Sequence, residues 1–333
     1  RPGVEDLFKM QRAGKADELT AIFADFLKAL QTPDYRDYNI PLWRSDCRQG
    51  DCVDELLEQP AVQTTLTTRL TQEAVRFIEQ AHDQPFLLYV PYTMPHLPIF
   101  ADTAFQGKSL AGPYGDTIEE IDWSVGEIIY ALKASGVDGN TLVFFSSDNG
   151  PWQSASTEFA GSAGPFRGAK QEVYEGGVRV PTIFWWPEKI TPKLSSEIGS
   201  VLDLYKTIAA LTGIEATQAI DSFDLSAELF AGEGSPRDEV ALYRKGELRA
   251  FRKGDYKLHL FDQAQGGKPL EKPELYNLRR DLAERDNVAI EHPEIVEAIK
   301  AAITKHRAGM ERRPPLFDQR FLEPDQDGRV TDQ

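Results

Sequence analysis

A carboxylate next to an amide forms the first pair of side chains suited to chemistry. Asp148 and Asn149 follow directly on the apolar run 141–146 and precede Gly150. Oxygen atoms of this kind are the ligands that hard cations such as Ca²⁺ and Mg²⁺ take in proteins. Asp-Asn-Gly is also a common turn, because these residues tolerate a positive φ. The pair is therefore a candidate metal site, with a plain turn as the alternative.

A glycine-rich segment that ends in a lysine is the second candidate. Glycines in residues 161–170 allow the backbone to approach a ligand closely, and Lys170 supplies a point charge for an oxyanion. Arg167 and Arg179 complete a local basic patch in an otherwise acidic chain. The alternative is a flexible surface loop whose charges are solvated.

A histidine between prolines is the third candidate. His96 lies between Pro95 and Pro98, just after the apolar run 86–90. Prolines restrict the backbone, so a histidine fixed here could bind an oxyanion or protonate a leaving group. A lone histidine is more often structural, and that alternative stays open.

These three segments meet only if the apolar runs before them are strands of one sheet. Apolar runs predict buried strands at residues 86–90, 141–146 and 182–186. Apolar residues at helical spacing predict helices at 15–30, 65–81, 116–135 and 201–211. This alternation indicates an α/β fold with a mainly parallel sheet sandwiched by helices. Ligands gather at the carboxyl ends of strands in such sheets, so His96 and Asp148 are expected at one edge.

The character of the sequence changes near residue 235. Short strands separated by turn residues are predicted at 240–243, 248–252 and 256–261, and a helix at 293–306. Residues from 312 onward are rich in Pro, Asp and Gln and are expected to lie extended on the surface. We therefore expect two domains, an α/β domain over residues 1–234 and a small antiparallel α+β subdomain over 235–333.

Composition excludes several classes of function. The 333 residues include 37 Lys and Arg against 53 Asp and Glu, a formal net charge of −16. Nucleic-acid binding needs clustered basic residues, so this balance argues against it. The sequence has no apolar run near the roughly 20 residues that span a bilayer. It begins with neither a methionine nor a signal peptide, which is expected of a mature product or an internal piece.

Cys47 and Cys52 are the two cysteines of the chain. Four intervening residues exceed the usual Cys-x-x-Cys redox spacing, and the absence of a nearby histidine makes a zinc site improbable. A small-loop disulfide and two free thiols remain as alternatives.

Several motifs together resemble the sulfatase family, in its arylsulfatase A-like branch within the alkaline phosphatase superfamily. They run in the family's order from about Ile40 to His306: residues 85–96 (PFLLYVPYTMPH), 114–126 (YGDTIEEIDWSVG), 141–151 (TLVFFSSDNGP), 168–181 (GAKQEVYEGGVRVP), 248–259 (LRAFRKGDYKLH) and 274–278 (ELYNL).

The resemblance implies a role for each candidate. Asp148 and Asn149 resemble the family's second pair of metal ligands, for Ca²⁺ rather than Mg²⁺. Lys170 is similar to the lysine that grips the sulfate oxygens, and His96 to the histidine that contacts sulfate or assists the leaving oxygen. The expected activity is hydrolysis of a sulfate monoester, a small molecule or a saccharide, at a calcium-centred site.

The chain departs from the family at the nucleophile. Family members make a formylglycine from the first residue of a Cys/Ser-x-Pro-x-Arg motif, and this sequence contains no such motif. The resemblance places that motif, and the other metal ligands, in an amino-terminal portion that precedes these residues. We expect the chain by itself to bind Ca²⁺ weakly and to hydrolyse no sulfate ester.

Three other interpretations remain open: a non-catalytic sulfatase-like scaffold, a phosphoester hydrolase of the same superfamily, and a complementing amino-terminal segment on a separate chain. Trp152 and Met94 are placed to contact a leaving group, although Met94 suits packing better. Family members enter the periplasm, the lysosome or the extracellular space, and the same is expected here.

Overall fold

The computed structural model describes residues 18, 33–37, 39–48, 51–152, 157–217, 220–262 and 267–310. The chain divides into two compact units, one up to Pro236 and one from Arg237. The predicted helix at 15–30 lies outside the described residues except for Glu18, and the predicted extended tail from 312 lies outside them entirely. In the described part, no helix is both long enough and apolar enough to cross a membrane.

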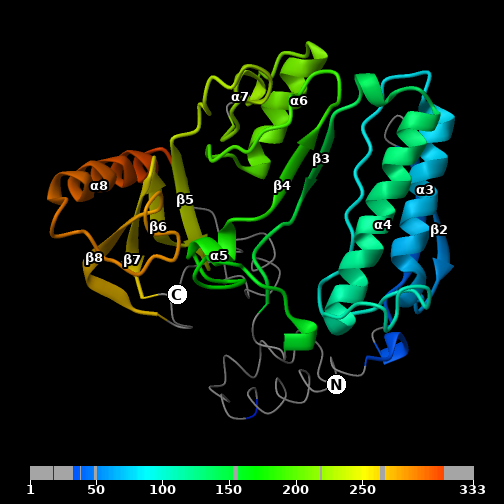
Figure 1. Cartoon of the computed structure of the whole chain (residues 1–333), viewed down its shortest axis with the longest axis horizontal. Helices are drawn as coiled ribbons and strands as arrows, with labels where there is room; N and C mark the ends of the chain where they lie inside the picture. Colours follow the sequence, from blue (N-terminus) through cyan, green and yellow to red (C-terminus); the bar gives the residue numbers. More distant parts are fainter. Residues whose placement is uncertain are drawn as a thin grey trace, which may run out of the picture. The chain divides into compact units, whose positions relative to one another are not determined.

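The first unit contains helices joined by long loops and two small sheets (Figure 1). Its elements are, in order, η1 (Tyr35–Asp37), β1 (Leu42–Arg48), β2 (Asp51–Glu58), η2 (Gln63–Thr65), α3 (Leu66–Ala81), α4 (Gly112–Ala134), η3 (Asp138–Asn140), β3 (Val143–Ser146), η4 (Thr157–Phe159), α5 (Glu175–Val178), β4 (Thr182–Trp185), η5 (Val201–Asp203), α6 (Leu204–Thr212) and α7 (Ser226–Ala231). The helices predicted at 65–81, 116–135 and 201–211 are confirmed by α3, α4 and η5 with α6.

Helices α3 and α4 pack side by side through a seam that is partly apolar and partly polar (Figure 1). Ile78, Ala131 and Leu132 form its apolar part. Glu120 is buried and accepts hydrogen bonds from the Thr68 hydroxyl at 3.2 Å and the Asp102 backbone N–H at 3.0 Å. Burial raises the pKa of Glu120, and these bonds oppose that shift. The seam anchors the loop that leads from residue 86 to α4.

The prediction of a mainly parallel sheet is wrong for the described residues. Strands β3 and β4 pair antiparallel, with Val143 opposite Trp185 and Ser146 opposite Thr182. Residues 86–90 pair with no strand of the described residues, and Leu87 and Tyr89 are 76% and 82% exposed. A strand requires backbone hydrogen bonds to a neighbouring strand, whereas an apolar run in the sequence indicates only that the segment tends to be buried. The run 86–90 therefore has the composition of a buried strand without a partner among the described residues.

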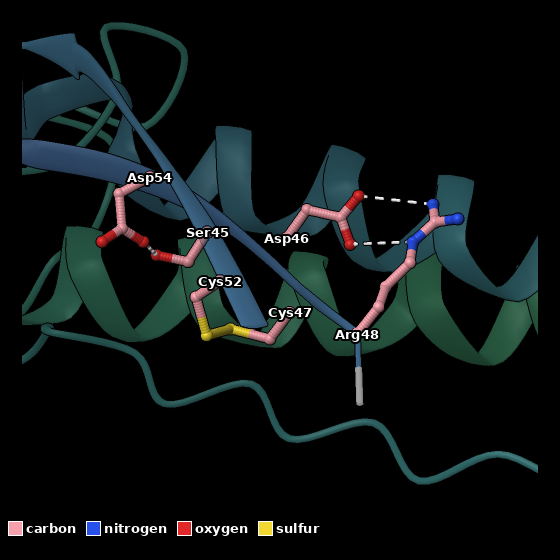
Figure 2. Close-up of a disulfide and its surroundings, with 6 residues drawn as sticks. All are labelled: Ser45, Asp46, Cys47, Arg48, Cys52 and Asp54. Atoms are coloured by element: carbon pink, nitrogen blue, oxygen red, sulfur yellow. Dashed lines mark hydrogen bonds and ion pairs between the residues drawn. A yellow bond between two sulfur atoms is a disulfide. The ribbon is translucent and has the colours of Figure 1, made fainter. Parts of the chain in front are cut away.

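A disulfide closes the hairpin of β1 and β2 (Figure 2). Cys47 and Cys52 lie directly opposite each other in the antiparallel register, with Cα atoms 4.0 Å apart. Further along the hairpin, the Ser45 hydroxyl donates to the Asp54 carboxylate at 2.7 Å. Of the two alternatives for the cysteines, the structure has the bridge.

The second unit is a four-stranded antiparallel sheet that packs on one helix. Its elements are β5 (Glu239–Arg244), β6 (Glu247–Lys253), β7 (Tyr256–Phe261), β8 (Pro269–Asn277) and α8 (Pro293–Ala308). Phe251, Leu258 and Leu275 of the sheet meet Ile299 and Ile303 of α8 in its core. The predicted strands and helix are confirmed, and β8 is an additional strand that the sequence reading did not predict.

A buried charge cluster lies in the second unit. Lys257 and Glu284 are fully buried and His259 nearly so. One carboxylate oxygen of Glu284 lies 3.0 Å from the Lys257 ammonium and 2.7 Å from His259 Nε2. Burial lowers the pKa of His259 below its usual value of 6.5, and the hydrogen bond to Glu284 opposes that shift.

This cluster predicts a loss of stability in mild acid. The pKa of His259 is lower in the folded state than in the unfolded chain, which takes up a proton below about pH 6.5. The free energy of unfolding therefore falls as pH falls through 6.5 toward the lower folded pKa. Urea unfolding at pH 7.5 and 5.5 should show a larger difference for the wild type than for His259→Gln. The exposed His82 is the matched control, and His82→Gln should keep the wild-type pH dependence.

Candidate active site

The segment after β3 makes a tight turn that only glycine can complete. Gly150 is buried, and its N–H donates to the carbonyl of Gly177 at 2.9 Å. A Cβ at Gly150 would overlap the carbonyl oxygen of Gly176. Asp148 is exposed, and the side chains of Asp148 and Asn149 have no hydrogen-bond partner among the described residues. Their oxygen atoms are therefore accessible to a ligand at the end of β3.

Backbone hydrogen bonds tie Lys170 to this turn. The Lys170 N–H donates to the carbonyl of Pro151 at 2.9 Å. The Gly176 N–H donates to the carbonyl of Arg167 at 2.7 Å, so helix α5 is held against the same loop. These bonds place the lysine and the Asp148–Asn149 pair on adjoining turns, although 20 residues separate them in sequence.

Two residues of the predicted basic patch, Arg167 and Arg179, contact other side chains of the same loop. The guanidinium of Arg167 lies 4.1 Å from the ring centroid of Tyr174, and that of Arg179 lies 4.8 Å from that of Phe166. Arg179 also lies 3.7 Å from the carboxylate of the buried Glu175. Both arginines therefore help to shape the loop that carries Lys170.

His96 reaches the same region through Trp152. Its ring centroid lies 6.3 Å from that of Trp152 in an edge-to-face arrangement, and the Lys170 ammonium lies 5.6 Å from the Trp152 ring centroid. His96 Nδ1 lies 2.6 Å from the Leu97 carbonyl, so Nδ1 carries the proton and donates to it. Nε2 is then the nitrogen left for a ligand. His96 is exposed, as this role requires.

The described residues supply only part of a metal site. No three His, Cys, Asp or Glu side chains of the described ranges are grouped to hold a metal ion. Asp148 and Asn149 have the oxygen ligands that suit Ca²⁺, but Ca²⁺ takes about six to eight oxygens. The oxygen atoms of Asp148 and Asn149 suit Ca²⁺ chemically, but two side chains are too few to complete its coordination shell.

Met94 and Trp152, the two residues expected to contact a leaving group, have different surroundings in the structure. Met94 is buried and packs on Phe100 and Ile121, and its sulfur accepts the Phe100 N–H at 3.3 Å. Met94 is therefore a packing residue. Trp152 contacts both His96 and Lys170, a link that the sequence reading missed. In the sequence, the one signal for this link was that Trp152 directly follows Pro151.

Glycine at position 177 is predicted to be essential for this arrangement. A Cβ there would overlap the carbonyl oxygens of Ala169 and Glu172, on either side of Lys170. Gly177→Ala should lower stability by about 1–3 kcal/mol and displace the Lys170 loop. Thermal unfolding measures the first effect. Gly126→Ala on α4 is the control, because its Cβ would meet no atom within 4 Å and should not destabilise the protein.

Comparison with solved structures identifies the fold. A sulfatase crystal structure, PsFucS1 from Pseudoalteromonas sp., superposes with a TM-score of 0.73 at 27% identity, covering 79% of this chain and 57% of that one. The described residues thus adopt part of a sulfatase fold, despite their small antiparallel sheets.

Family models and curated relatives agree with this assignment. Residues 5–214 match the sulfatase model, and residues 235–326 match the C-terminal region of aryl-sulfatase. The chain belongs to the sulfatase family. It is 38% identical over 229 residues to N-acetylgalactosamine-6-sulfatase of Mus musculus, which covers 67% of this chain and 44% of the relative. It is 36% identical over 246 residues to arylsulfatase A of Homo sapiens, covering 66% and 48%. The chain spans about half the length of these curated relatives.

Proposed function

We propose that this chain forms part of a sulfuric ester hydrolase and carries the later residues of its sulfate site. The observation that supports this most is the hydrogen bond from the Lys170 N–H to the Pro151 carbonyl, which holds a lysine beside the Asp148–Asn149 pair. Membership of the sulfatase family supplies the reaction class.

Each residue then has a defined part in binding the sulfate group. The Lys170 ammonium donates to peripheral sulfate oxygens. His96, when Nε2 is protonated as well as Nδ1, gives the Nε2 proton to the ester oxygen as its bond to sulfur breaks and the alcohol leaves. Asp148 and Asn149 hold Ca²⁺, which when bound neutralises charge on the sulfate oxygens. Expulsion of the alcohol increases negative charge on these oxygens, so fixed cationic groups favour the transition state.

The nucleophile has to come from outside these 333 residues, because they contain no Cys/Ser-x-Pro-x-Arg motif. We propose that an amino-terminal segment supplies the formylglycine and further Ca²⁺ ligands, either in the same polypeptide or as a separate chain. The exposed side of residues 86–90, with Leu87 and Tyr89, agrees with an uncovered surface where further chain packs.

Intact mass and activity test this proposal together. The protein from its native source should have a mass well above the 37.3 kDa of this chain, or copurify with a second polypeptide, and contain a peptide with the Cys- or Ser-to-aldehyde conversion. That material should hydrolyse an aryl sulfate, whereas residues 1–333 alone should not. Preference for an aryl phosphate in a parallel assay would assign the protein to phosphoester hydrolysis and contradict the proposal.

A non-catalytic scaffold is the second candidate, and the missing nucleophile motif favours it. A scaffold is expected to have a native mass near 37.3 kDa. It should bind sulfate but hydrolyse no sulfate ester.

The compartment follows from the same proposal. A disulfide such as Cys47–Cys52 persists in oxidising surroundings, which agrees with the periplasm, the lysosome or the extracellular space.

A further inference from the structure

One aromatic ring lies against both Lys170 and His96. The Lys170 ammonium is 5.6 Å from the Trp152 ring centroid, and the His96 ring meets the same indole edge to face at 6.3 Å. In the described part of the chain, no carboxylate forms an ion pair with Lys170. Among the described residues, the indole is therefore the group that interacts with the end of this lysine.

The indole itself is held in place by a small apolar cluster. It packs against the buried side chains of Leu97 and Ile99, on which the half-buried Tyr114 and Phe159 also pack. Leu97 is the chain neighbour of His96, and its carbonyl accepts the His96 Nδ1 proton. Pro151, the chain neighbour of Trp152, accepts the Lys170 N–H. A single packed ring thus connects the backbones of two loops that carry the two side chains.

We infer that Trp152 is a positioning residue that fixes the separation of His96 and Lys170. The face of an indole attracts an ammonium, and its packing prevents the ring from following either side chain. Two groups that must contact oxygens of the same sulfate need a fixed separation, because a small displacement removes one of the two contacts. The inference rests on the proposed function only for the identity of the anion, not for the placement of the two side chains.

Chemical labelling of lysine tests the placement without any sulfate. The 333-residue chain is treated with a trace of acetic anhydride, and mass spectrometry gives the acetylation rate of Lys170 relative to the exposed Lys108. Trp152→Leu keeps an apolar side chain but removes the ring, so the relative rate at Lys170 should rise about two- to fivefold. Trp152→Phe keeps a ring and should stay within about twofold of the wild type. Lys189, which lies 6.0 Å from the Trp186 ring, should not change in either variant.

Two further measurements make the outcome decisive. Nuclear Overhauser contacts between the ring protons of His96 and Trp152 should appear in the wild type, and their absence would overturn the inference even if Trp152→Leu fails to fold. An unchanged Lys170 rate in a folded Trp152→Leu variant would overturn it as well. Inorganic sulfate should bind the Leu variant about fivefold more weakly than the Phe variant. If labelling responds but the complete protein hydrolyses no sulfate ester, the positioning role stands and the proposed function fails.

Discussion

Lys170→Ala is expected to reduce sulfate-ester hydrolysis by the complete protein at least about 100-fold in kcat/KM. The lysine contributes a charge-assisted hydrogen bond to oxygens that gain negative charge in the transition state, and alanine leaves that charge uncompensated. In the isolated 333-residue chain, the same substitution should weaken binding of inorganic sulfate about tenfold or more. Calorimetric titration with sodium sulfate measures this effect separately from turnover.

Lys108→Ala is the matched control for this experiment. Lys108 is exposed and lies on the loop before α4, so its loss changes the net charge equally without touching the proposed site. A Lys170→Ala variant that keeps wild-type turnover would contradict the assignment of Lys170. Weaker binding in Lys108→Ala as well would show a general effect of charge rather than a specific contact.

Glu284→Ala is expected to cause the largest loss of stability, about 3–5 kcal/mol. Glu284 is fully buried and accepts from both Lys257 and His259, so alanine leaves a buried ammonium without this carboxylate. Amide hydrogen exchange in β6 and β7 measures the effect, because these strands carry the core that the cluster supports.

Two internal comparisons make this test specific. All five tryptophans lie before Pro236, so tryptophan fluorescence reports on the first unit and should hardly change in Glu284→Ala. Glu294→Ala removes a carboxylate that is exposed and lies 3.4 Å from His292, and it should cost less than about 1 kcal/mol. A similar loss of stability in both variants would show that the buried cluster stabilises the protein no more than the exposed ion pair does.

Periodicity predicted the elements whose structure is local. The apolar spacing of residues 65–81 and 116–135 predicted α3 and α4, because one face of each helix is buried against the other. Turn residues such as Gly254 predicted the β6–β7 hairpin. Strand β8 escaped prediction because Pro and charged residues interrupt its apolar pattern.

Sheet pairing was the part that sequence pattern could not supply. Residues 86–90 are all apolar and residues 141–146 mostly so, but among the described residues only the second run pairs, through β3, antiparallel with β4. Pairing depends on a partner distant in sequence, which no local window contains. The resemblance to sulfatases had the same limit, because it identified residues and not their neighbours.

Candidate site residues were predictable by type, whereas the contacts between them were not. Asp148, Asn149, Lys170 and His96 stood out by sequence context, and their proposed roles remain predictions. The missing Cβ atoms of Gly150 and Gly177 leave room for neighbouring carbonyls and so allow the loops to adjoin, but this close approach is visible only in the structure. Sequence context predicts Trp152 as a leaving-group contact, whereas its contacts with His96 and Lys170 are the basis for the positioning role that we infer.

The run 86–90, which pairs with no strand of the described residues, also affects how this chain behaves at high concentration. Exposed Leu87 and Tyr89, together with Ile183 at 57% exposure on β4, present apolar side chains to other copies. A net charge of −16 keeps copies apart by mutual repulsion, but salt screens that repulsion beyond about 8 Å at physiological ionic strength. The isolated chain should therefore stay dispersed in dilute buffer and precipitate as salt is added, which makes low ionic strength the condition for every binding experiment on it.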